Sequence, residues 1–274
     1  MQFYKLLSSQ YTKDEIQIHF EMLCEAYFSY TPAETVLNID KSLSIEKEVQ
    51  LKAALIALKE NVPIQYIIGT VVFAGLELEV DQRVLIPRPE TEEMVHWLLS
   101  QHRDETPLRV LDIGTGSGCV AIAIKKARPN WEVTAWDIDL DALEIARNNA
   151  KKHKTTVNFE AVDVLAPQLP NKLWDIIVSN PPYIPESERT YTAAHVLREP
   201  EHAIFVPDSS PLIFYKHIIG YATEQLNANG TIYFEGHEPL MKTLDLLLMQ
   251  AGFSDIVLRN DFRTKPRFIR ANYL

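Results

Sequence analysis

The sequence predicts an α/β protein preceded by a small helical domain. From Leu108 onward, apolar runs of strand length alternate with helical patterns, which is typical of a parallel sheet covered by helices. The first 68 residues instead carry apolar side chains at helical spacing. A chain of 274 residues is long enough for two domains. We therefore expect a helical domain over residues 1–68, a β-hairpin linker over 69–88 and an α/β domain over 89–274.

The helical pattern of the first domain predicts the core of a small bundle rather than a site. Its apolar residues at helical spacing are Ile16, Phe20, Leu23, Tyr27, Phe28, Val49, Leu51, Ala54, Leu55 and Leu58. Thr31-Pro32 separates two of the helices. Next along the chain, the runs 71–73 and 76–80 are broken by Ala74-Gly75, which predicts a hairpin.

The remaining elements follow in alternation. We expect helices over 91–101 and 119–128, and strands over 108–113, 132–136, 157–162 and 174–179. Thr91 or Glu90 should lie near the N-cap of the first of these helices. The runs 255–258 and 267–269 should add an antiparallel pair at the sheet edge. The polar segments that follow the parallel strands are where a ligand is expected, because ligands bind at the carboxyl ends of such strands.

A glycine-rich loop follows the first strand of the α/β domain. After Asp112 the chain reads Gly114-Thr115-Gly116-Ser117-Gly118 and then enters a helix. Glycines permit a tight turn and a close approach of the backbone to a ligand at a helix N-terminus. The spacing G-x-G-x-G differs from the dinucleotide fingerprint G-x-G-x-x-G, which disfavours a nicotinamide-dependent oxidoreductase.

Acidic residues end the next two strands. Asp137 ends the second strand, at the position where ribose hydroxyls are held in folds of this kind. Asp163 ends the third strand, and a carboxylate there suits the amino group of an adenine. Together with the glycine loop, this order of residues favours a cofactor that contains adenosine but no pyrophosphate.

The strand over 174–179 runs into Asn180-Pro181-Pro182-Tyr183. Proline fixes its own φ and pushes the preceding residue to extended geometry, so this loop should be stiff. The Asn180 side-chain oxygen and the Pro181 carbonyl then offer two acceptors for a planar amino group, and Tyr183 offers a flat face. The alternative is a proline-rich turn that only ends the strand.

These motifs resemble those of a known enzyme class. The segment 112–118 resembles the first motif of S-adenosylmethionine-dependent methyltransferases, and 180–183 resembles the signature of those that methylate amino groups. The segments 63–69, 85–92 and 199–204 resemble the release factor glutamine methyltransferases, the HemK/PrmC family. The resemblance covers about residues 63 to 270. It implies a Rossmann-like methyltransferase domain, S-adenosylmethionine as cofactor, and the glutamine of the Gly-Gly-Gln loop of peptide chain release factors as substrate.

The site residues follow from the motifs and the resemblance together. The expected cofactor-binding residues are Asp112, Gly114, Thr115, Gly116, Ser117, Gly118, Asp137, Asp163, Val164 and Asn180. The expected substrate-binding residues are Asn180, Pro181, Pro182 and Tyr183, of which Asn180, Pro181 and Tyr183 are assigned to catalysis. Whether Arg88, Glu90 and Glu92 contact the substrate is left open, since acids also favour a helix N-terminus.

The sequence departs from the family pattern at three places. Val164 stands where an aromatic residue often follows the third acid. Glu235-Gly236-His237 stands where the family often has Glu-Ile-Gly, and the C-terminal segment 261–267 lacks the usual glycine. The change at Val164 bears on one packing contact to the adenine, and we expect neither of the other two changes to reach the residues assigned to chemistry.

Composition indicates which classes of partner and which cellular compartment to expect. A net charge of −10 argues against a broad nucleic-acid footprint, although a DNA or RNA amino-group methyltransferase stays the alternative. Cys24 and Cys119 are the two cysteines, which suits a reducing compartment. The eight histidines show no zinc spacing, and His195, His202 and His237 read as surface or loop residues. We expect a cytoplasmic monomer that has no metal and no membrane segment.

Overall fold

The computed structural model describes residues 2–38, 41–104, 106–166 and 168–273. Residues 1 and 274, at the outer ends of the predicted domains, lie outside these ranges. The chain divides into two compact units. The first unit comprises the chain up to Thr70 together with residues 193–198, and the second comprises residues 71–192 and 199 onward.

The first unit is helical. Its helices are α1 (Gln2–Leu7), α2 (Lys13–Phe28), α3 (Pro32–Leu37), α4 (Ile45–Lys59) and α5 (Ile64–Ile68). Thr12 and Thr31 begin α2 and α3 with capping boxes completed by Glu15 and Glu34, which satisfies backbone N–H groups at both helix starts. The core consists of Leu7, Ile16, Leu23, Ala54, Leu58 and Ile64. Val49, which its helical spacing had placed in this core, is instead 60% exposed, because it lies on the outer face of α4.

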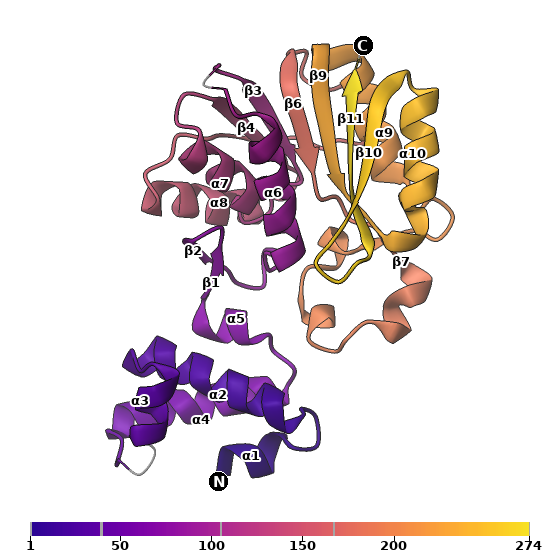
Figure 1. Cartoon of the computed structure of the whole chain (residues 1–274). Helices are drawn as coiled ribbons and strands as arrows, with labels where there is room; N and C mark the ends of the chain where they lie inside the picture. The colour runs from indigo at the N-terminus through magenta and orange to yellow at the C-terminus, as the bar shows by residue number, and fades with distance from the viewer. Residues whose placement is uncertain (1, 39–40, 105, 167, 274) are drawn as a thin grey trace. The chain divides into compact units, whose positions relative to one another are not determined.

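The second unit is built on a twisted sheet of seven strands among the described residues (Figure 1). Its strands, in chain order, are β3 (Arg109–Ile113), β4 (Glu132–Asp137), β5 (Asn158–Ala161), β6 (Trp174–Ser179), β9 (Leu226–Glu235), β10 (Phe253–Asn260) and β11 (Pro266–Tyr273). Their spatial order is β10-β11-β9-β6-β3-β4-β5. The strands from β3 to β9 are parallel, while β10 and β11 form the antiparallel addition. The predicted α/β class is confirmed.

Helices cover both faces of this sheet. The helices are α6 (Pro89–Gln101), α7 (Cys119–Ala127), α8 (Leu140–Lys152), α9 (Ile213–Gln225) and α10 (Met241–Gln250). Residues of α6, α7 and α8 share one apolar cluster with Val110, Val133 and Ile176 of the strands. Residues of α9 and α10 share the second cluster with Leu111, Trp136 and Ile177. Neighbouring strand residues thus face opposite layers, as the alternation of side chains in a strand requires.

The predicted hairpin is formed by β1 (Thr70–Phe73) and β2 (Leu76–Glu79). Phe73 and Leu78 are buried in the same cluster as α6 and α7, so the hairpin packs within the second unit. Asn149 of α8 fixes it there. Its Oδ1 accepts from the backbone N–H of Glu79, and its Nδ2 donates to the carbonyl oxygens of Glu79 and Ser117. One buried amide therefore joins the hairpin to the glycine-rich loop.

Two further details differ from the sequence expectations. Helix α6 begins at Pro89, two residues before the expected start; Arg88 is its N-cap, Glu90 and Thr91 lie near that cap as expected, and the Thr91 hydroxyl donates to Glu235. Short strands β7 (Ile184–Pro185) and β8 (Phe205–Val206) pair with each other beyond β6. They are flanked by the 3-10 helices 186–191 and 201–203, and a further 3-10 helix, 238–240, lies between β9 and α10. In the described part of the chain, we find no helix with the length and apolar character needed to cross a bilayer.

Candidate active site

The order of the strands reverses between β3 and β6. From β3 the chain proceeds through β4 to β5 on one side, and β6 then pairs with β3 on the other side. Such a switch point opens a crevice at the carboxyl ends of the two strands. The loop 114–118 leaves β3 and the loop 180–183 leaves β6, so the two most informative sequence motifs lie on either side of this crevice.

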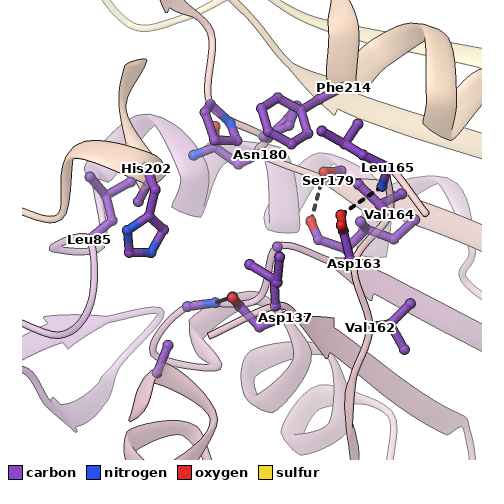
Figure 2. Close-up of a pocket in the computed structure, with 18 of the residues that line it drawn as sticks. Leu85, Asp137, Val162, Asp163, Val164, Leu165, Ser179, Asn180, His202 and Phe214 are labelled. Atoms are coloured by element: carbon purple, nitrogen blue, oxygen red, sulfur yellow. Dashed lines mark hydrogen bonds between the residues drawn. The ribbon is translucent and has the colours of Figure 1, made fainter. Parts of the chain in front are cut away.

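A cavity of about 280 Å³ occupies this position. Of the predicted site residues, its walls contain Gly114, Gly116, Asp137, Asp163, Val164, Asn180, Pro181 and Pro182. Figure 2 shows Leu85 and His202 at one end of this cavity and Asp163, Val164 and Leu165 at the other. A smaller adjoining space of about 40 Å³ is lined by Asp112, Thr115, Ser117 and Thr91, and it shares Gly114, Gly116 and Asn180 with the larger one. The topology thus gathers these segments around one site.

The glycine loop needs its glycines for two different reasons. Gly114 and Gly116 have φ of +74° and +52°, and a Cβ on either would meet no protein atom within 4 Å. Because both residues line the cavity, a side chain there would take up ligand space. Gly118 lines neither cavity; it has φ of +81°, and a Cβ would lie 2.9 Å from Ile122 Cδ1 and 3.1 Å from Ala146 Cβ. Its role here is the close packing of α7 on α8.

Substitution of Gly118 by alanine should therefore destabilise the fold without touching the cavity wall. The left-handed backbone and the two short contacts together predict a loss of about 1–3 kcal/mol. Thermal unfolding of Gly118→Ala measures it, and Gly116→Ala is the matched control because it shares the positive φ but has open space. Equal unfolding temperatures for the two variants would contradict the packing role of Gly118.

Asp112 holds the glycine loop in place. Its Oδ2 accepts from Thr115 Oγ1 at 2.6 Å and from the backbone N–H of Ala121 at 3.2 Å. The carboxyl is 2% exposed, and burial raises its pKa to about 7. Asp112 lines the smaller cavity, so a direct contact with the cofactor stays a prediction alongside this structural function.

Asp137 joins the ends of β3 and β4. Its Oδ2 accepts from the backbone N–H of Gly116 at 2.8 Å, and its Oδ1 accepts from that of Asp139 at 3.0 Å. Each carboxylate oxygen keeps a second lone pair, and the residue lines the larger cavity. Burial raises the pKa of this carboxyl, although the two backbone hydrogen bonds oppose the shift. The side chain is thus a fixed acceptor beside the glycine loop.

Asp163 and Val164 form the far end of the cavity. The Oδ1 of Asp163 accepts from the backbone N–H of Leu165 at 2.9 Å, which fixes the carboxylate above an apolar wall (Figure 2). Val164 is 8% exposed and belongs to the apolar cluster beneath α9 and α10. Val162, Leu165 and Phe214 complete this apolar slot, so the site presents a carboxylate acceptor beside apolar side chains.

The loop after β6 is fixed at both of its ends. Asn180 Nδ2 donates to Thr91 Oγ1 at 3.1 Å, and the Thr91 hydroxyl donates to Glu235 Oε2 at 2.7 Å. The Tyr183 hydroxyl donates to Glu235 Oε1 at 3.3 Å, and its ring stacks on His237 at a centroid distance of 6.0 Å. Tyr183 is absent from the walls of both cavities as the described residues form them, so its contact with a substrate stays a prediction.

Two long-range pairs that support the site were not predicted from the sequence, which had left the role of Arg88 open. Thr91 and Glu235 are buried polar residues that support Asn180. Arg88 Nη2 pairs with Glu199 Oε1 at 2.5 Å, and the Ile86 N–H donates to Glu199 Oε2, which ties the segment 85–88 to the residues just before His202. An acid at the end of the apolar strand β9 was the available signal for Glu235. The pairing of Arg88 with Glu199 had no local signal.

His202 is an exposed residue, as the sequence predicts, and it also lines the larger cavity, where its Nε2 lies 3.4 Å from Asp139 Oδ2 (Figure 2). His237 lies in a loop, as expected, where it is partly buried against Tyr183 and lies 3.0 Å from Glu188 Oε1. Among the described residues, no group of three or more His, Cys, Asp or Glu side chains is arranged to hold a metal ion.

Comparison with known proteins agrees with this geometry. Residues 94–224 match the family described as Methyltransferase small domain, and residues 2–69 match the PrmC N-terminal domain. Two solved structures share the fold at low sequence identity. They are a methyltransferase from Pyrococcus furiosus (TM-score 0.53, 18% identity, 83% of this chain and 98% of that one) and the hMettl16 catalytic domain in complex with an RNA hairpin (TM-score 0.58, 17% identity, 84% and 83%). These likenesses confirm the Rossmann-like methyltransferase fold.

Curated relatives are much more similar in sequence. The release factor glutamine methyltransferase of Flavobacterium psychrophilum is 38% identical over 276 aligned residues, which cover 99% of this chain and 97% of the relative. That of Bacteroides thetaiotaomicron is 38% identical and covers 97% and 96%. That of Streptococcus pneumoniae is 42% identical and covers 73% and 71%. This chain therefore belongs to the release factor glutamine methyltransferase family.

Proposed function

We propose that this protein transfers a methyl group from S-adenosylmethionine to the side-chain amide nitrogen of the glutamine in the Gly-Gly-Gln motif of peptide chain release factors. The observation that carries the proposal is a single cavity in which one group of residues suits an adenosine and another group suits a planar amide. Asp137 and Asp163 present acceptors beside the glycine loop, and Asn180, Pro181 and Pro182 line the same space.

The residues that line the cavity fit the cofactor. Asp137 offers a fixed carboxylate for the ribose hydroxyls, and Asp163 offers an acceptor at the edge of the apolar slot for the adenine amino group. The open space over Gly114 and Gly116 suits close backbone contact with the amino acid portion. When bound, S-adenosylmethionine supplies an electrophilic methyl group attached to a positively charged sulfonium sulfur. The sulfur is the leaving group and becomes a neutral thioether.

The residues after β6 would prepare the substrate amide. An amide nitrogen is a poor nucleophile because its lone pair is delocalised into the carbonyl group. Asn180 Oδ1 and the Pro181 carbonyl would accept the two amide hydrogens and aim the lone pair at the methyl group, which is an effect of proximity and orientation. The same acceptors stabilise the positive charge that develops on nitrogen. After the N–C bond forms, one amide proton is lost to water, so no general base is required.

The direct test is methyl transfer from radiolabelled S-adenosylmethionine to purified release factor, with DNA and RNA as parallel acceptors. We expect label on the release factor, located at the Gly-Gly-Gln glutamine by peptide mass spectrometry. The net charge of −10 makes nucleic acid a poor partner, and we propose that the protein makes no direct nucleic-acid contact. Label on nucleic acid with none on the release factor would overturn the assignment.

We further propose that the helical unit recognises the body of the release factor. Ile45, Val49 and Ile56 are 83%, 60% and 61% exposed, and their spacing places them on one face of α4. Exposed apolar residues that gather on one face are typical of a protein-binding surface. Remote binding energy of this kind can be used to position the reacting side chain.

Replacing Val49 and Ile56 together by glutamate tests this surface in the full chain. We expect the KM for whole release factor to rise at least about tenfold, which corresponds to about 1.4 kcal/mol, while methylation of a short Gly-Gly-Gln peptide stays unchanged. Leu246 and Met249, which are 51% and 55% exposed on α10, provide the matched double glutamate control. An unchanged KM in the α4 variant would remove this surface from recognition.

Compartment and assembly state complete the proposal. Cys24 and Cys119 are both buried and free, which supports the reducing environment of the cytoplasm, where release factors act. We propose that the protein acts as a monomer, since one chain supplies all of the residues assigned to the site. Analytical sedimentation of the protein alone and with release factor measures the assembly state of the free protein and of its complex.

A further inference from the structure

The hydrogen bonds around Asn180 follow a fixed direction. A carboxylate accepts hydrogen bonds and donates none, so the hydrogen of the Thr91 hydroxyl must be given to Glu235. The Thr91 oxygen is then left as an acceptor, and the Asn180 group that faces it must be the –NH2. Asn180 Oδ1 consequently stays available on the opposite side of its amide. The charge on one buried carboxylate thereby decides which end of the Asn180 side chain a substrate meets.

We propose that Thr91 and Glu235 are positioning residues that hold the Asn180 amide with its oxygen presented to the substrate. This inference rests on the proposed amide methylation and adds two residues to its machinery. A reversed Asn180 would present two N–H donors to the –NH2 of a glutamine, so hydrogens would face hydrogens. The orientation of the Asn180 amide that Thr91 sets therefore decides whether the loop can bind the substrate amide, and no change in the backbone is needed.

The surroundings of Glu235 strengthen the assignment. Its side chain is 1% exposed and Thr91 is 3% exposed, so bulk water cannot replace either partner. Tyr183 donates to the second carboxylate oxygen, and the Tyr215 hydroxyl donates to the Glu235 carbonyl. One side chain thus anchors Tyr183 directly and Asn180 through Thr91, which are the two ends of the Asn-Pro-Pro-Tyr loop.

The electrostatic environment leaves Glu235 able to titrate. Burial raises its pKa to about 7, Arg267 of β11 opposes that rise, and Glu90 of α6 adds to it. The Tyr183 hydroxyl beyond β6, Tyr215 of α9 and Cys119 of α7 also face this carboxyl, and burial raises the pKa of each of these three groups. Once protonated, Glu235 can donate to Thr91, and the Thr91 hydroxyl is then free to turn toward Asn180.

Isosteric substitution of Thr91 tests the proposal in the full chain. Thr91→Val removes the hydroxyl but keeps the shape, and Thr91→Ser keeps the hydroxyl. We expect kcat to fall about tenfold to a hundredfold in the valine variant, because a buried polar partner is lost, and to stay within about threefold of the unchanged protein in the serine variant. The dissociation constant of S-adenosylhomocysteine should be the same in all three proteins. Equal losses in both variants, or no loss in Thr91→Val, would overturn the proposal.

Glu235→Gln provides a second, pH-dependent readout. The kcat of the unchanged protein should fall as the pH drops through about 7, where Glu235 takes up its proton. In Glu235→Gln this part of the acid limb should be absent and kcat should be low throughout. An acid limb and a kcat that both match those of the unchanged protein would contradict the role of the carboxylate.

A measurement without substrate separates this inference from the proposed function. In full-length protein labelled at asparagine, nuclear magnetic resonance reports the exchange of the two Asn180 Nδ2 hydrogens with solvent. We expect slow exchange in the unchanged protein and in Thr91→Ser, and exchange at least about tenfold faster in Thr91→Val, because the acceptor is gone. If exchange behaves in this way but release factor is not methylated, the proposed function fails and the positioning role stands. Equal exchange in Thr91→Val and Thr91→Ser would remove the positioning role.

Discussion

Asn180→Ala should reduce methyl transfer to release factor by about a hundredfold or more, since it removes one oriented acceptor from the reacting amide. Asn180 lines the cavity next to Pro181, and its Nδ2 donates to Thr91, so alanine removes both the Oδ1 acceptor and this anchor of the loop. The dissociation constant of S-adenosylhomocysteine should change little, because the ribose and adenine contacts assigned to Asp137 and Asp163 are elsewhere.

Single-turnover kinetics with saturating cofactor measure this effect on the chemical step alone. Asn148→Ala is the matched control, because Asn148 is exposed on α8 and lines neither cavity among the described residues. Activity within about threefold of the unchanged protein in Asn180→Ala, well below the loss expected for a catalytic hydrogen-bonding group, would show that the amide is held by other groups.

Asp137→Ala should weaken cofactor binding by about tenfold to a hundredfold. A hydrogen bond from a ribose hydroxyl to a carboxylate contributes about 1.5–3 kcal/mol, and the dissociation constant rises accordingly. The same carboxylate accepts from the backbone N–H groups of Gly116 and Asp139, so part of the loss will come from a loosened glycine loop.

Titration calorimetry with S-adenosylhomocysteine distinguishes these two contributions. Asp137→Asn keeps the shape and one acceptor, so its affinity should lie between those of Asp137→Ala and the unchanged protein. Asp141→Ala, an exposed acid in the first turn of α8, is the control for a change in net charge. Unchanged affinity in both Asp137 variants would mean that the second-strand acid does not hold the ribose.

The sequence was informative wherever the signal is local. The glycine loop, Asp137, Asp163 and the Asn-Pro-Pro segment each follow a strand that its apolar run identifies, and the carboxyl ends of parallel strands meet at one edge of the sheet. Those residues therefore needed no long-range information to be placed around one cavity. The motif alone does not explain why residue 118 is glycine. The reason is close packing against Ala146, which lies outside the loop sequence.

The residue pairs that support the site could not be predicted, because their partners are far apart in the sequence. Thr91 and Glu235 are 144 residues apart, and Arg88 and Glu199 are 111 apart. Neither pair has a spacing or a composition that marks it as a pair, and each exists because the topology brings α6 beside β9 or the segment 85–88 beside residue 199. The expectation that the change at Gly236-His237 does not reach the residues assigned to chemistry is wrong, because His237 stacks on Tyr183.

The long sequence separation within the Thr91–Glu235–Asn180 network also has a consequence for biosynthesis. A chain emerging from the ribosome can form β3 to β6 and the cofactor loops before β9 has been made, since these elements are contiguous in sequence. The carboxylate that orients Asn180 arrives only with residue 235, and it needs a closed loop of more than half the chain. In a nascent chain, Thr91 and Asn180 are therefore present long before the carboxylate that completes their hydrogen-bond network.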